Sequence, residues 1–238
     1  LIAEVSLNPE EYEAPKYEGI VDSIKQGIKK YDALFIDEAQ DFSEDLAFLA
    51  KAMLVDEQNS RLGVFYDDVQ VVRSDSFGDA FMISTPPFLL NENIRNTSNI
   101  YSWAMENTDL GTDVIVNPVE GPWPVSEIMN DKKHLTHRLE NMLKRFLEDE
   151  DLQSSSMVIL TEDADQFIEL FDGSIAKWKF VKKYSTNGTD EIKVASVEEF
   201  KGLESDMIVY IHSKNTTDNL NYIAYTRARY YLLELILK

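Results

Sequence analysis

Two pairs of acidic residues follow short apolar runs near the start of the sequence. Asp37 and Glu38 come directly after the run 33–36, and Asp67 and Asp68 follow a second run. A short run that is apolar on both faces is typical of a buried parallel strand, and ligands of open α/β sheets bind beyond the carboxyl ends of such strands. One carboxylate there can hold Mg²⁺ through water while its neighbour polarises an attacking water. The pairs indicate metal-assisted hydrolysis, although Asp-Glu alone is more often an acidic loop after a core strand.

Five short strings occur along the chain in a fixed order. They are LFIDEAQD at 34–41, FYDDVQ at 65–70, LNENIRNT at 90–97, FKGLESD at 200–206 and YIAYTRA at 222–228. In this order they resemble motifs II to VI of superfamily 1 helicases of the UvrD/Rep type, and most of all the helicase-like ATPases often found with nuclease-related domains. Because the strings extend over most of the chain, a chance match of all five is improbable.

The resemblance implies a site for ATP and Mg²⁺ between two motor domains. Its hydrolytic residues would be Asp37, which holds Mg²⁺ through water, Glu38, which polarises water, and Gln70, which senses the γ-phosphate. Arg95 and Arg227 would reach across from the second domain, because a permanently charged guanidinium forks onto phosphate oxygens and suits an arginine finger. Without the family, both arginines would be interpreted as ordinary surface or helix-end cations.

The same resemblance implies further contacts with the nucleotide. Glu204 would accept hydrogen bonds from the ribose, and Gly202 is small enough to let the backbone approach closely. The other positions that the resemblance assigns to nucleotide binding are Gln40, Asp41 and Asp67. Taken alone, Glu204 would be an ordinary surface acid.

A phosphate-binding loop is missing from the sequence. Such a loop needs G-x-x-x-x-G-K-[ST], and none of the nine glycines is followed by lysine. In the family the loop lies upstream of motif II, and this chain also opens without Met. We therefore expect the C-terminal part of a longer ATPase or helicase, which would be inactive alone.

The pattern of elements predicts an α/β protein, and the resemblance implies the RecA-like P-loop NTPase fold, with parallel sheets flanked by helices. Pro86 and Pro87 can continue neither a β-ladder nor a helix, so they mark a boundary between two domains. Residues 1–87 would be the C-terminal part of the first RecA-like motor domain, and 88–238 the complete second one. We expect helices at 17–30, 44–55, 96–107, 132–148, 163–171 and 218–228, and strands at 33–36, 62–66, 157–160, 192–195, 207–211 and 232–237.

The net charge limits how this chain can bind nucleic acid. With 23 basic and 43 acidic residues the charge is −20, which excludes a broad basic binding surface. Single-stranded nucleic acid, with DNA favoured over RNA, would have to bind in a local groove, and the candidate contacts are Ser196, Lys201 and Phe77. Two positions depart from the family: Ile94 stands where a base-stacking Tyr is usual, and Glu198, in place of His, would repel a phosphate.

Several classes of protein and site are excluded by composition. The chain has no Cys, so it has no disulfide, cysteine-ligated zinc or thiol nucleophile. No run of about 18 apolar residues is present, and the first residues lack a signal-peptide pattern. The expected compartment is therefore the cytoplasm, with no membrane as partner.

Two other functions stay open. The motor scaffold could serve as a protein-interaction module whose acidic surface suits basic partners. A more remote alternative is a two-metal nuclease, because clustered carboxylates can hold two metal ions. The carboxylates available to it are Asp37, Glu38, Asp41, Asp67 and Asp68. That alternative leaves the arginines and the string at 200–206 unexplained.

Overall fold

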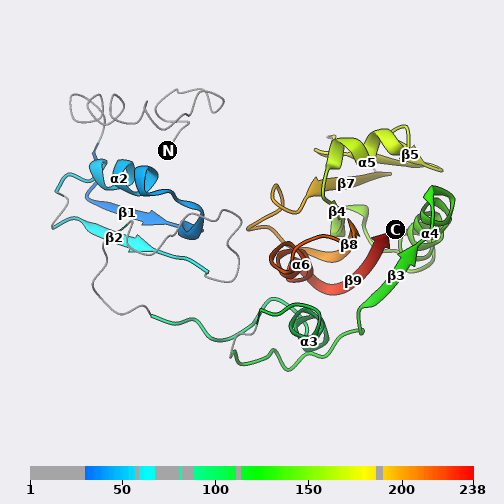
Figure 1. Cartoon of the computed structure of the whole chain (residues 1–238), viewed down its shortest axis with the longest axis horizontal. Helices are drawn as coiled ribbons and strands as arrows, with labels where there is room; N and C mark the ends of the chain where they lie inside the picture. The colour runs from blue at the N-terminus through cyan, green and yellow to red at the C-terminus, as the bar shows by residue number, and fades with distance from the viewer. Residues whose placement is uncertain (1–29, 57–58, 68–80, 82–87, 111–113, 186–189) are drawn as a thin grey trace. The chain divides into compact units, whose positions relative to one another are not determined.

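The chain is divided into two compact units, residues 1–88 and 89–238 (Figure 1). The structure, a computed structural model, describes residues 30–56, 59–67, 81, 88–110, 114–185 and 190–238. The predicted boundary lies one residue from this division, while the identity of the units as motor domains stays a prediction. The predicted helix at 17–30 lies outside the described residues.

Two parallel strands and a helix form the described part of the first unit. Strand β1 (Ala33–Ile36) pairs in parallel with β2 (Arg61–Val64). Helix α2 (Glu44–Ala52) begins where the side chain of Ser43 accepts a hydrogen bond from the backbone of Leu46, as N-cap residues do. Ala47 and Ala50 of α2 pack against Ile36 of β1 and Phe81, which makes a small core. The first predicted strand has the predicted bounds, whereas the second is shorter.

The second unit is built on a larger sheet, which has seven strands in the described part of the chain. Its strands are β3 (Val125–Met129), β4 (Met157–Thr161), β5 (Ser174–Ile175), β6 (Trp178–Val181), β7 (Glu191–Ser196), β8 (Ser205–Ser213) and β9 (Ala228–Leu237). They lie in the order β3-β9-β8-β4-β7-β6-β5, and all neighbours are parallel except β5 and β6. The carboxyl ends of β4, β7, β8 and β9 therefore lie side by side along one end of the sheet, and their amino ends lie along the opposite end.

Helices flank this sheet. They are α3 (Ser98–Glu106), α4 (Lys132–Lys144), α5 (Ala164–Leu170) and α6 (Asp218–Tyr225), and short helical turns lie at η3 (Ala39–Asp41) in the first unit and at η5 (Arg145–Asp149) and η6 (Ser154–Ser156) in the second. The side chains of Asp131, Asp163 and Thr217 each accept a hydrogen bond from the backbone three residues later. These caps satisfy amides at the helix N-termini and so explain where α4, α5 and α6 begin.

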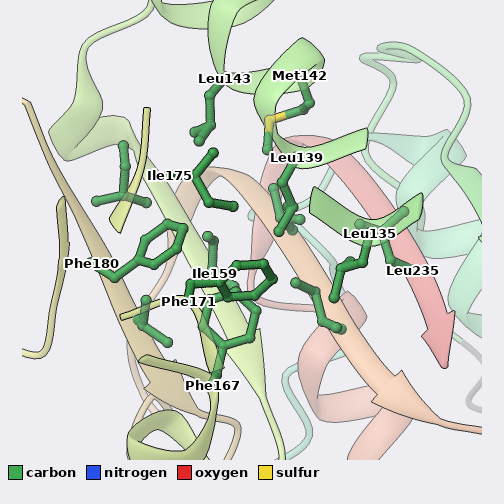
Figure 2. Packing of buried hydrophobic residues seen from close by; sticks show 14 of the residues in the cluster. Leu135, Leu139, Met142, Leu143, Ile159, Phe167, Phe171, Ile175, Phe180 and Leu235 are labelled. Atoms are coloured by element: carbon green, nitrogen blue, oxygen red, sulfur yellow. The ribbon is translucent and has the colours of Figure 1, made fainter. Parts of the chain in front are cut away.

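The helices cover opposite faces of the sheet. Val209 and Ile211 of β8 belong to the core formed with α4 and α5, in which Leu139 and Phe167 take part (Figure 2). Side chains alternate along a strand, so Tyr210 lies on the other face, where its hydroxyl donates to a side chain of α6. Helix α3 packs beside α6. The result is a three-layer α/β arrangement, which confirms the predicted class.

Two differences from the predicted elements have physical causes. Strand β3 was not predicted, because it lies at the edge of the sheet and only Met129 is buried, which leaves little hydrophobic signal. The helix predicted at 218–228 ends at Tyr225 instead. The Asn96 side chain donates to the carbonyls of Thr226 and Ala228. These carbonyls are therefore bonded outside the helix, which ends at Tyr225 before β9 begins. No helix in the described part of the chain has both the length and the hydrophobicity that crossing a bilayer requires.

Candidate functional site

In the first unit, Asp37 and Glu38 lie beyond the carboxyl end of β1, as predicted. The backbone amide of Glu38 donates to Oδ1 of Asp37 at 3.0 Å. Glu38 has φ 52° and ψ 40°, a left-handed conformation that costs a residue with a side chain about 1 kcal/mol. Strain of this kind collects at functional sites, where the surrounding structure holds it in place. The turn is therefore a candidate site by its geometry as well as by its residue types.

Gln40 is the residue that holds this turn. Its side chain is buried, with 1% exposed. The amide Nε2 donates to Oε2 of Glu38 at 2.6 Å, and Oε1 accepts from the backbone amide of Asp67 at 3.1 Å. Because Asp67 follows β2, this side chain links the ends of both strands, which backbone hydrogen bonds between Phe65 and residues 36 and 39 also join. Gln40, predicted to bind nucleotide, is placed here to orient Glu38.

An open depression of about 300 Å³ lies beside Asp37, and Phe35 and Phe65 also line it. Ligand sites usually enclose about 300–1,000 Å³, so this depression is at the small end of that range. Because it is open to solvent, a ligand there would remain in contact with water. Oxygen ligands of the kind that Asp37 provides are those that Mg²⁺ prefers.

Four predicted residues of the first unit are not placed. Asp68, Gln70 and Phe77 lie outside the described residues, as does the side chain of Asp41. Within the described residues, no group of three or more His, Asp or Glu side chains is arranged to hold a metal ion.

In the second unit, residues from two of the five strings meet in one cluster with Arg229, which directly follows the string at 222–228. Nε of Arg95 lies 2.8 Å from Oε2 of Glu204. Nε of Arg229 lies 3.6 Å from the other oxygen of Glu204, and its Nη1 lies 3.1 Å from Oδ1 of Asp206. The side chains of Arg95, Glu204 and Arg229 are 37%, 43% and 41% exposed, so they are accessible to a ligand. We name these four residues the arginine cluster.

Backbone contacts fix the arginine cluster. Oδ1 of Asn93 accepts from the amides of Arg95 and Asn96, which folds the segment into a tight turn. Asn96 in turn donates to the carbonyl of Thr226 at 3.0 Å, and the carbonyl of Arg229 accepts from an amide of the same segment at 3.1 Å. The cluster therefore lies at the amino ends of β8 and β9, held by the same hydrogen bonds that end α6.

Arg227 does not take part in this cluster. It is 1% exposed, and its guanidinium donates to the carbonyls of Ile223 at 3.2 Å and Leu203 at 3.3 Å. Action as an arginine finger would require it to leave these carbonyls. The sequence prediction named Arg227 and not Arg229, the arginine two residues later that pairs with Glu204 and Asp206, and the role of either residue stays a prediction.

Two of the three predicted nucleic-acid contacts, Ser196 and Lys201, lie at the start of and along the connection from β7 to β8. Ser196 ends β7, where its hydroxyl accepts from the amide of Glu199 at 3.1 Å and its own amide donates back to the Glu199 carboxylate. Lys201 is half-buried in the same connection. Gly202 has φ 78°, the left-handed region that favours glycine. Ser196 and Glu204 thus lie at opposite edges of the sheet, and residues 197–204 join them.

Comparison with known proteins gives distant likenesses only. No protein-family model matches the chain, and no curated protein matches it. Among solved structures, the chain is similar to the C-terminal domain of a possible DNA helicase from Lactobacillus plantarum WCFS1, at 16% identity and a TM-score of 0.47, over 60% of this chain and 86% of that one. It is also similar to the PRRSV helicase, at 15% and 0.49, over 89% of this chain and 36% of that one.

A third similar structure is arterivirus nonstructural protein 10, a helicase, at 13% identity and a TM-score of 0.44, over 89% of this chain and 40% of that one. The chain therefore spans well under two thirds of both viral helicases. With identities of at most 16% and TM-scores below 0.5, the function has to be argued from the residues of the chain itself.

Proposed function

We propose that this chain forms part of an ATP-dependent, superfamily 1 helicase-like motor that moves along single-stranded nucleic acid, DNA rather than RNA. ATP and Mg²⁺ would bind between two RecA-like domains, to which the two units correspond. The phosphate-binding loop would be supplied by residues outside the 238, so the chain alone would not turn over ATP. The bound Mg²⁺ would neutralise charge on the phosphates.

The observation that carries this proposal is the arginine cluster. Arg95 and Glu204 come from two strings that are far apart in the sequence, and Arg229 directly follows the string at 222–228. The ion pair of 2.8 Å between Arg95 and Glu204 brings two of these strings together at one accessible place. In the proposed motor, an arginine finger and a ribose-binding carboxylate serve one nucleotide, so their presence in one accessible cluster supports the proposal.

The first unit supports the hydrolytic half of the proposal. Asp37 is exposed beside an open depression, where it can hold a hydrated cation. Glu38 is held by the buried amide of Gln40 at 2.6 Å, so its carboxylate has a fixed direction in which to polarise water. Such fixed geometry is what lowers the barrier to hydrolysis.

The arginines would act on charge that develops during phosphoryl transfer. A guanidinium from the second unit would complete the site when the domains close, and cycles of closure would move the motor along the strand. Because the chain is strongly acidic, single-stranded nucleic acid would bind only in a local groove. Ser196 and Lys201 are the candidate contacts with it in the second unit. Glu204 would bind the ribose.

ATP turnover tests this proposal most simply. The 238-residue chain alone should show no hydrolysis above background, whereas a polypeptide that also carries a Gly-Lys-Ser/Thr loop should hydrolyse ATP in the presence of single-stranded DNA. Normal turnover by the chain alone, or none in the longer polypeptide, would contradict the proposal. Binding of basic proteins by a longer polypeptide with a degraded loop would favour the interaction module.

A further inference from the structure

The sheet of the second unit has two edges that differ in how they are protected. One edge is β5, which has two residues and turns back into β6, with Lys177 in the turn and Lys179 in β6. Short strands and lysines are usual means by which proteins keep a sheet edge from pairing with another chain. The other edge is β3, which among the described residues pairs only with β9 (Figure 1).

Strand β3 carries neither of these protections. It has five residues, Val125–Met129, and none of them is lysine or proline. Its one charged side chain, Glu127, is paired with Arg138 of α4 at 2.8 Å. An edge strand presents a row of backbone N–H and C=O groups on the side away from its single neighbour. The edge of β3 can therefore accept a further strand.

We propose that β3 is a docking edge for an extended, basic segment of a partner protein, which adds to the sheet as a further strand. In this mode of recognition, main-chain hydrogen bonds provide affinity and alternate side chains provide specificity. The inference is independent of the proposed ATPase, because β3 contains none of the residues assigned to ATP or to nucleic acid.

Exposed apolar side chains on both faces of this edge indicate an extended partner. Val125 and Ile128 are each 46% exposed. Val125 shares a face with Met129, which belongs to the core formed with α4. Ile128 lies on the opposite face together with Ser126, whose side chain hydrogen bonds to Glu234. A helix laid on one face would reach only one of the two apolar side chains, whereas a strand beside β3 places side chains on both faces.

The charge of the chain indicates that the partner is basic. Residues 88–128, which lead up to β3 and form most of it, contain six acidic residues and one basic residue. That basic residue, Arg95, is already paired with Glu204. Trp123, which is 48% exposed just before β3 and lies edge-on to Trp103, offers a ring that a lysine or arginine can contact. A second copy of the chain would carry the same net charge of −20 and would be repelled.

Calorimetric titration of two short peptides into the 238-residue chain tests the inference. One peptide has a Val-Ile-Val centre with two lysines at each end, and in the other peptide glutamates replace the lysines. The lysine peptide should bind, and the glutamate peptide should bind about tenfold more weakly or less, because the chain repels it. Methylation of the backbone amides of the lysine peptide should abolish binding, since it removes main-chain hydrogen bonds and leaves the charge unchanged.

Two substitutions place a lysine on the open edge. Val125→Lys and Ile128→Lys should each raise the Kd of the lysine peptide about two- to fivefold, the usual effect of losing one cross-strand apolar pair. Leu170→Lys is the matched control, because it adds the same charge at a leucine of α5 that is 39% exposed in the same unit. It should leave the Kd nearly unchanged. Thermal unfolding identifies any variant that fails to fold, and Ile128→Thr then takes the place of Ile128→Lys.

Hydrogen exchange identifies where the peptide binds. Slower exchange at amides of residues 125–129 in the presence of the lysine peptide is the expected result, and slower exchange only elsewhere would overturn the inference. Equal binding of the methylated or the glutamate peptide, no measurable binding of the lysine peptide, or an equal effect of Leu170→Lys would also overturn it. Self-association of the unaltered chain that Ile128→Lys abolishes would assign the edge to a second copy and contradict the proposed partner.

Discussion

At the scale of single residues, the contrast between Gln40 and Arg227 shows what a sequence string can and cannot predict. Both were assigned to the nucleotide because of the string in which they occur. Gln40 is instead buried and bonded to Glu38 and Asp67, and Arg227 is buried against backbone carbonyls. A string predicts which residue types gather at a site. Which of them faces the solvent depends on contacts that only the fold supplies.

Glu38 is expected to be the residue on which hydrolysis depends most in the first unit. In a polypeptide that carries the phosphate-binding loop, Glu38→Gln should lower kcat for ATP by about 10²–10⁴-fold and leave nucleotide affinity nearly unchanged, because it removes only the group that polarises water. Steady-state kinetics would measure both quantities. Asp32→Asn, which alters an exposed acid at the other end of β1, is the control and should have no effect. Equal kcat in both variants would refute the assigned role.

Ile94 is expected to limit how well the site distinguishes bases. It is 79% exposed next to Arg95, where it can pack on a base without the specific geometry of an aromatic ring. Ile94→Tyr should tighten ATP binding by about 0.5–1.5 kcal/mol, typical of an aromatic pair, and leave tripolyphosphate binding unchanged. Val125→Tyr on the edge strand β3 is the control. Equal gains for ATP and tripolyphosphate would show that the ring does not contact the base.

At the scale of elements, the sheet of the second unit separates two of the predicted site residues. Ser196 and Glu204 lie at opposite edges of the sheet, and the short connection 197–204 joins them. The hydrophobic runs at 157–160 and 207–211 predicted the central strands well, because buried parallel strands are apolar throughout. The end of α6 was not predictable from local sequence, since Asn96, distant in the chain, determines it.

A buried polar network connects β8, β9 and α6. Oε1 of Glu234 faces Nε2 of His212 at 3.0 Å and accepts from the hydroxyl of Tyr225. Burial raises the pKa of Glu234, but hydrogen bonds from His212, Ser126 and Tyr225 outweigh it and hold the pKa below its ordinary value of 4.5. The ionised carboxylate therefore stabilises the fold above pH 4.5, and this contribution is lost as the pH falls through the lowered pKa.

Glu234→Gln should lower the free energy of unfolding by about 1.5–3 kcal/mol at neutral pH, the usual contribution of a hydrogen bond to a charged group. The difference from the unaltered chain should shrink as the pH falls from 4.5 through the lowered pKa of Glu234 in the folded state. Urea unfolding above and below that pH would measure it. Glu127→Gln, which breaks a half-exposed pair with Arg138, is the control and should cost at most about 1 kcal/mol. A difference that stays constant with pH would contradict the role of the charge.

At the scale of the whole molecule, the net charge and the five strings gave predictions about different properties. The charge concerned the surface that could bind nucleic acid, and the strings concerned the function. The charge of −20 argued against a broad nucleic-acid surface, and the five strings argued for a motor. The structure brings these two arguments closer together. Glu204 and Asp206 form ion pairs with Arg95 and Arg229, so part of the negative charge is neutralised within the candidate site. The central claim is the proposal that Arg95 serves ATP hydrolysis in the complete motor.

The most direct test of that claim is ATP hydrolysis by a polypeptide that carries the phosphate-binding loop together with these 238 residues, measured with single-stranded DNA for the unaltered protein and for Arg95→Ala. Arg145→Ala, which alters an exposed arginine paired with Glu150 in the same unit, serves as the control. The account predicts that Arg95→Ala lowers kcat by about 10³–10⁵-fold, the effect of an arginine finger, while Arg145→Ala leaves it unchanged. Hydrolysis that continues at the same rate without Arg95 would contradict the account.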